Sequence, residues 1–173
     1  MKEKRNFDLF AQRRLDAMIS AHSRGLTSSE ELVEAARMAE QRAIEEIGAA
    51  TENRFLTYSK MVKSIKEVRN GTPQEDVYRG IDKWVIFKRH LNLPALPVQI
   101  KSSDKDVRKY KYGDPQKNTG PNPGFIKLQG VLMVINCGPS VKPEYFKKQI
   151  YLETRRIRNI LEVNPSLADL IKR

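Results

Sequence analysis

A continuous apolar run near the C-terminal end of the chain, GVLMVINCG at residues 130–138, most constrains the fold. The run has the length of a strand and no polar alternation, which is typical of a central strand buried on both faces of a sheet. A helical segment follows it at residues 143–163, with Pro143 at a position suited to a first helical turn. The pair predicts an α/β fold, a mixed central sheet flanked by helices.

Two further strands are expected before this run, at residues 81–88 and 95–102, because both segments are rich in β-branched and aromatic residues. The loop between them, RHLNLP, has the right length for a hairpin. Ser102 or Ser103 then caps a predicted helix. The Gly, Pro and Asn residues of 113–124 predict a long mobile loop.

The first half of the chain has a helical pattern. Apolar residues at three-to-four spacing predict a helix that ends near Gly25, and Ser28 with Glu31 forms a capping box that opens a second one. The apolar stripe changes phase near Gly48, which predicts a break there and another helix to about Arg69.

Turn-forming residues at 70–76 close this helical half. We expect residues 1–44 to form an N-terminal helical extension and residues 45–173 to form the main domain, in one compact unit overall.

The charge balance indicates the kind of partner. The 173 residues include 32 Lys and Arg against 21 Asp and Glu, a formal net charge of +11, which favours nucleic acid over an anionic membrane surface. No apolar run approaches the roughly 20 residues that cross a bilayer. The single cysteine, Cys137, suits a reducing compartment, so we expect a cytoplasmic protein.

Three polar residues converge in the predicted hairpin. If its strands pair antiparallel, Asp82 lies beside Gln99 and Lys101, at a cross-strand spacing of about 5 Å. The two-residue period of VQIK places Gln99 and Lys101 on one face and the apolar residues on the other. An Asp entering an apolar strand has no evident packing reason to be there.

This trio suits phosphodiester hydrolysis. A carboxylate can hold Mg²⁺, which prefers oxygen ligands, and a lysine can serve the attacking water or the phosphate. A second acid is expected from the helical half. Glu52 is the best candidate because it shares a helix face with Phe55, and Glu45 and Glu46 rank lower.

The order of a helical Glu, the GID triplet, a hairpin and VQIKSS resembles the PD-(D/E)xK nuclease superfamily, which has the restriction-endonuclease-like fold. The resemblance spans about residues 45–138. It implies that Asp82, Gln99 and Lys101 occupy the Asp, acidic and Lys positions of the family motif. It also implies a metal site that includes the Ile100 carbonyl.

Gln99 departs from the family pattern, because it replaces the acid with a neutral amide. Some members, including Mrr-like restriction nucleases and a cyanobacterial intron-encoded homing endonuclease, carry a similar Gln-x-Lys form. The resemblance therefore implies a Mg²⁺-dependent DNA endonuclease, with Mn²⁺ as a substitute metal. Its catalytic residues would be Glu52, Asp82, Gln99 and Lys101, and its metal ligands Asp82, Glu52, Gln99 and Ile100.

The expected partner is double-stranded or branched DNA, cut by a homo-oligomer, since cleavage of both strands usually needs two sites. Basic residues of the segment after the hairpin and of the last helix could contact phosphates, although a solvated basic surface explains them equally well. These residues are Lys105, Arg108, Lys109, Lys111, Lys117, Arg155 and Arg156. The sequence is also compatible with a non-catalytic nucleic-acid-binding protein of the same fold, and with an RNA-binding or ribosome-associated protein.

Overall fold

The computed structural model describes residues 2–171, with side chains described from residue 10 onward. The chain forms two compact units, Met1–Ala50 and Thr51–Arg173. The long helix α2 (Ser29–Ser59) contributes its first part to the first unit and its last part to the second.

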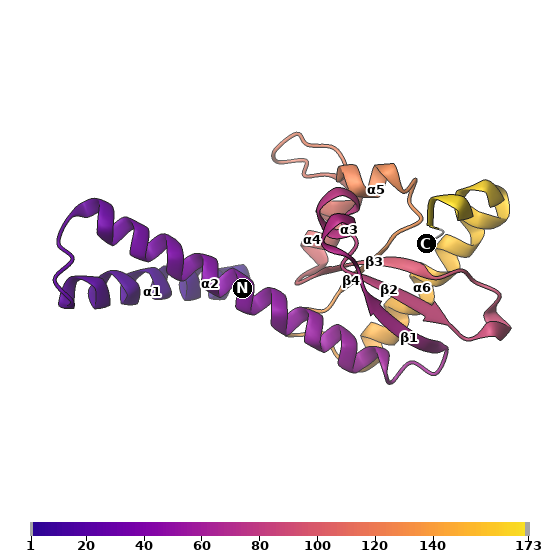
Figure 1. Ribbon diagram of the computed structural model, residues 1–173, viewed down its shortest axis with the longest axis horizontal. Helices are drawn as coiled ribbons and strands as arrows, with labels where there is room; N and C mark the ends of the chain where they lie inside the picture. The colour runs from indigo at the N-terminus through magenta and orange to yellow at the C-terminus, as the bar shows by residue number, and fades with distance from the viewer. Residues whose placement is uncertain (1, 172–173) are drawn as a thin grey trace. The chain divides into compact units, whose positions relative to one another are not determined.

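The first unit consists of two helices, α1 (Lys2–Ser23) and the N-terminal part of α2, joined by a short turn (Figure 1). The predicted capping box is confirmed, since the Ser28 backbone N–H donates to Glu31 Oε2 at 3.2 Å and the Glu31 N–H donates to Ser28 Oγ at 3.2 Å. The helices pack through small residues and interhelical ion pairs, one of which joins Arg13 to Glu46 at 2.7 Å. The buried apolar residues are Ala21, Ala36 and Ala43.

The predicted break at Gly48 is wrong, because α2 continues through it to Ser59. A lone glycine in a helix interior costs only about 1 kcal/mol relative to alanine, and the rest of this helix offsets that cost. The predicted helix to Arg69 is also wrong, since Ile65–Asn70 form strand β1. The helical spacing of Tyr58, Val62 and Ile65 continued across the true helix end by coincidence.

The second unit contains a four-stranded mixed sheet within the described residues, in the order β1-β2-β3-β4. Strands β1 (Ile65–Asn70), β2 (Lys83–Phe87) and β3 (Leu96–Lys101) pair antiparallel, and β4 (Met133–Asn136) joins β3 in parallel. The predicted hairpin is therefore confirmed. The prediction of an α/β fold with a mixed sheet flanked by helices is confirmed as well.

Helices lie on both sides of this sheet (Figure 1). Ser103 caps α4 through its side chain, as expected. The prediction of a turn at residues 70–76 is wrong in part, because a capping box of Thr72 and Glu75 opens a short helix there. The elements are α3 (Pro73–Arg79), α4 (Asp104–Tyr112), α5 (Pro123–Lys127), α6 (Pro143–Val163) and the 3₁₀ turns η1 (Arg89–Leu91) and η2 (Pro165–Ile171).

Strand alternation gives the two sheet faces different side chains. Val85 and Phe87 point to the face covered by α6, where Phe146 packs edge-on against Phe55 and Tyr58 of α2 at centroid distances of 5.4 and 5.6 Å. Trp84 lies one residue before Val85 in β2, so its side chain points to the opposite face of the sheet.

Strand β4 was predicted to be central, and this is wrong: it is the last strand of the described sheet, although all four of its residues are buried. Side chains of α6 take the place of a further strand. Gln149 bonds both the N–H and the carbonyl of Asn136, at 2.9 and 3.0 Å, and Arg156 donates to the Leu132 carbonyl at 2.8 Å. The outer edge of β4 is thus satisfied by a helix.

Within residues 2–171, none of the helices is both long enough and apolar enough to span a membrane.

Candidate functional site

Asp82 immediately precedes β2, and its main chain is hydrogen-bonded to the neighbouring strand β3. Its N–H donates to the Val98 carbonyl at 2.9 Å. Its carboxylate Oδ2 accepts hydrogen bonds from Gln99 Nε2 and from the Ile100 N–H, both at 2.6 Å. The register predicted from the sequence is therefore confirmed, because Lys83 pairs with Val98 and Asp82 falls opposite Gln99.

Lys101 follows at the end of β3, on the same face as Gln99. Its ammonium lies over the ring of Tyr110 from α4, with Nζ 4.6 Å from the ring centroid. A cation in this position is attracted by the negative face of the ring. Tyr110 therefore helps to hold Lys101 beside the carboxylate.

Burial perturbs both charged groups. It raises the pKa of Asp82 to about 6, an effect that the hydrogen bond from Ile100 opposes and the negative charges of Asp76 and Glu52 reinforce. It also lowers the pKa of the Lys101 ammonium, against the opposing charge of Asp82. An acid and a base shifted toward neutrality in one place are typical of groups that exchange protons in catalysis.

Asp76 and Tyr110 also belong to this site, although neither was predicted there from the sequence. Asp76 lies in α3, which was not predicted, and its charge raises the pKa values of both Asp82 and Tyr110. The Tyr110 hydroxyl is buried and has no hydrogen-bond partner among the described residues. Burial raises its pKa to about 12, so it is a neutral phenol next to the carboxylate.

Gly80 makes room for this hydroxyl. Its φ of 63° lies in the left-handed region, and a Cβ added there would lie 2.2 Å from Tyr110 Oη and 3.0 Å from Gln99 Oε1. A side chain at this position would therefore displace two groups of the site at once.

We expect Gly80→Ala to lower the free energy of unfolding by about 2–3 kcal/mol, from the left-handed backbone and the displaced phenol together. Adding Tyr110→Phe should recover part of this loss, because the nearest ring carbon would then lie at an ordinary 3.4 Å. Urea unfolding of the two single variants and the double variant measures the coupling.

Gly120→Ala is the matched control, because nothing lies within 4 Å of the position of its Cβ. Additive effects of Gly80→Ala and Tyr110→Phe would contradict the contact between them.

Glu52, the predicted second acid, lies near the site but has another partner. Its carboxylate forms an ion pair with Lys83, the residue after Asp82, and Lys83 also donates to Asn70 Oδ1 at 3.1 Å. Its charge is close enough to raise the pKa of Asp82. Of the lower-ranked acids, Glu46 pairs with Arg13 in the first unit.

The donors present fit a hard cation held mainly by water. The described residues contain no cluster of three or more His, Cys, Asp or Glu side chains that could hold a metal. Asp82 uses Oδ2 for two hydrogen bonds, and the Ile100 carbonyl points to the same side as the N–H that reaches Asp82. One carboxylate, one carbonyl and several waters suit Mg²⁺. The unpartnered Tyr110 hydroxyl suits an additional water.

The basic residues predicted to contact DNA divide into two groups. The exposed residues are Lys105, Arg108, Lys117 and Arg155. The remaining three are less exposed and form ion pairs: Lys109 pairs with Asp114 at 2.7 Å, Lys111 with Glu153 at 2.5 Å, and Arg156 with Glu153, while Arg156 also donates to main-chain carbonyls.

Comparison with protein families, with curated proteins and with solved structures finds no match to this chain. Its function is therefore inferred from the residues and their geometry.

Proposed function

We propose that this chain is a Mg²⁺-dependent DNA endonuclease with a restriction-endonuclease-like core. The observation that carries the proposal is the position of Asp82 at a strand entry, directly opposite Gln99 and next to the Ile100 N–H, with Lys101 one residue further on. The order of elements, from the end of α2 through the β2–β3 hairpin and α4 to β4, supports the resemblance to the PD-(D/E)xK superfamily.

Asp82 and the Ile100 carbonyl would hold the metal, with Gln99 orienting the Asp82 carboxylate through its amide. When bound there, Mg²⁺ polarises the scissile phosphate and lowers the pKa of a bound water. The Lys101 ammonium is placed by Tyr110 and has a lowered pKa, so it can stabilise negative charge on the phosphate or exchange a proton with the attacking water. Glu52 would contribute a second negative charge to the metal site only if its ion pair with Lys83 were broken.

Double-stranded or branched DNA is the proposed substrate, and the formal charge of +11 supports a polyanionic partner. Cleavage of both strands calls for two sites, which is consistent with the expected homo-oligomer. A cytoplasmic location remains part of the proposal. A non-catalytic nucleic-acid-binding protein is the second candidate, favoured by the neutral Gln99 and by the engagement of Glu52 with Lys83.

The test is nicking of supercoiled plasmid in Mg²⁺, in Mn²⁺ and in EDTA, with wild-type protein, Lys101→Met and the control Lys66→Met. Lys66 is exposed on β1 and lies outside the site. We expect metal-dependent nicking that falls about 100-fold or more in Lys101→Met and is unchanged in the control. Nicking that persists in EDTA, or equally in Lys101→Met, would contradict the proposed site. DNA binding without any cleavage would favour the second candidate.

A further inference from the structure

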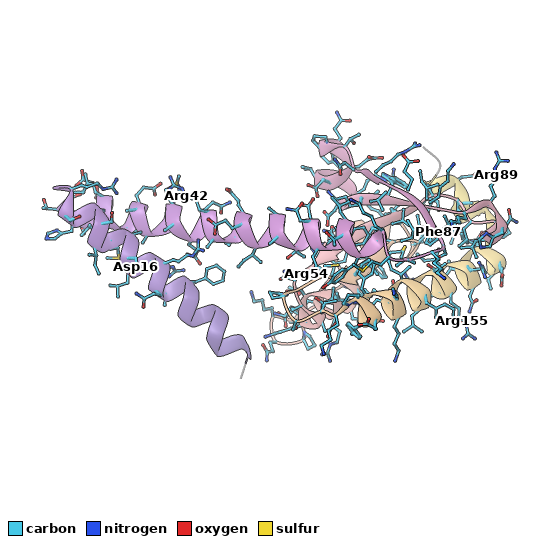
Figure 2. All side chains as sticks on the ribbon, turned by 90° about the horizontal axis from the view of Figure 1, so that it is seen from below. Asp16, Arg42, Arg54, Phe87, Arg89 and Arg155 are labelled. Carbon is cyan, nitrogen blue, oxygen red and sulfur yellow. The ribbon has the colours of Figure 1, made fainter. Side chains whose placement is uncertain are left out.

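A groove lies along α6, on the sheet face opposite Asp82. It encloses about 400 Å³, within the size range of small-molecule pockets. Its floor contains Phe87, which alternates in β2 with the residues on the Asp82 side, and Leu91 of η1. Figure 2 labels Phe87 of β2 and Arg155 of α6, which belong to two of the elements that line the groove. We call it the α6 groove.

The charged residues of the α6 groove are all basic. Lys147, Arg155 and Arg158 line it, and no acidic residue is found among the described residues of its lining. Lys147 and Arg155 are exposed and have no ion-pair partner within the described part of the chain, while Arg158 donates to the Leu91 carbonyl at 3.3 Å. Unpaired cations around a depression attract an anion.

The α6 groove also has an aromatic wall. Tyr151 lies on α6 between the basic residues, and 63% of its surface is exposed. The Thr154 hydroxyl is buried at the groove without a hydrogen-bond partner among the described residues. An exposed aromatic ring beside cations offers a face on which a base can stack.

Basic residues that follow a groove, with an aromatic side chain between them, are the means by which proteins bind single-stranded nucleic acid: the cations follow the backbone and the ring stacks on a base. We propose that the α6 groove binds a single strand, with phosphates on Lys147, Arg155 and Arg158 and a base against Tyr151 above Phe87 and Leu91. The groove is separate from the Asp82 site, so the proposal does not depend on cleavage.

The position of the groove limits what it could hold. The nucleotides bound on the α6 face are not the nucleotides at Asp82, because the sheet lies between the two sites. The groove would therefore hold an unpaired flank or a displaced strand of a branched substrate, or a second molecule.

The test measures binding of a fluorescein-labelled oligo(dT) of about 12 nucleotides by anisotropy, with the full chain in EDTA so that no metal-dependent cleavage occurs. We expect Tyr151→Ala to weaken binding about tenfold and Tyr151→Phe to keep it. Lys147→Gln with Arg155→Gln should reduce the slope of log K against log salt by about 1.4, since each single-strand phosphate contact contributes about 0.7.

Lys148→Gln is the matched control, because Lys148 is exposed on the same helix but does not line the groove. It should leave both the affinity and the salt slope for oligo(dT) close to wild type. Circular dichroism melting confirms that each variant is folded. Unchanged oligo(dT) binding in Tyr151→Ala and in the double variant would overturn the proposal, and so would losses confined to a duplex of the same length. Failure of plasmid cleavage would not affect it.

Discussion

Asp82→Asn is expected to abolish metal-dependent cleavage and at the same time to stabilise the folded protein. The asparagine carbonyl can still accept the hydrogen bonds from Gln99 and Ile100, so the local geometry is kept. The negative charge that would hold the metal is lost, and we expect the nicking rate to fall about a thousandfold or more.

The gain in stability depends on pH. The pKa of Asp82 is raised from its ordinary 3.8 to about 6, so the folded protein holds this proton more tightly than the unfolded chain does. The cost of burying the charge is absent below about pH 4, grows between about pH 4 and pH 6, and is complete above that range. Asp82→Asn should therefore raise the free energy of unfolding by up to about 3 kcal/mol at pH 7.5, and by little at pH 4.

Urea unfolding in EDTA at the two pH values measures this difference. Glu162→Gln is the control, because Glu162 is an exposed residue of α6. This variant should change the free energy of unfolding by the same small amount at both pH values. If Asp82→Asn lost stability at pH 7.5 relative to wild type, Asp82 would be a structural anchor of the hairpin instead of a strained functional acid.

The largest loss of stability is expected for Glu153→Ala. The Glu153 carboxylate is only 12% exposed and pairs with Lys111 Nζ at 2.5 Å and with Arg156 at 3.0 Å. The Lys111 side chain is 8% exposed, and burial already lowers the pKa of its ammonium. Removal of the carboxylate leaves that ammonium buried without its partner, so the free energy of unfolding should fall by about 3–5 kcal/mol.

The double variant Lys111→Met with Glu153→Ala should regain a good part of this loss, because the unpaired buried charge is removed as well. Glu162→Ala on the exposed face of α6 should change stability by less than about 0.5 kcal/mol. If Glu153→Ala and Glu162→Ala were equally stable in urea, the ion pair would contribute nothing measurable to the fold.

Local sequence patterns predicted the structure correctly where only one local geometry is compatible with the pattern. The alternation in VQIK and its antiparallel partner fix which residue faces Asp82, because a shift by one residue would turn every side chain of the strand to the other face. Ser103 and Pro143 marked helix starts through their own chemistry. The convergence of Asp82, Gln99 and Lys101 could therefore be predicted.

Features that depend on distant contacts could not be predicted. Strand β1 was predicted as a helix, because Ile65 and Val68 have the three-residue spacing of a helix face. A bulge between Ile65 and Glu67 brings the two side chains to one face of the strand, and no local pattern in the sequence predicts it. The position of Tyr110 could not be predicted, since nothing local shows that α4 brings its ring under Lys101. The capping box of Thr72 with Glu75, together with Pro73 at the first helical position, was a signal for α3 and thus for the position of Asp76.

The way in which α6 closes β4 has a consequence for how copies of this protein can assemble. An incoming strand at that edge would have to displace Gln149 and Arg156, and also the Glu153 carboxylate near the Val134 N–H. Charged residues are frequent along β1 at the other end of the sheet, which discourages an added strand there. Both edges of the described sheet therefore disfavour an added strand, and we expect any homo-oligomer to form through helices or loops instead of a sheet that continues between copies.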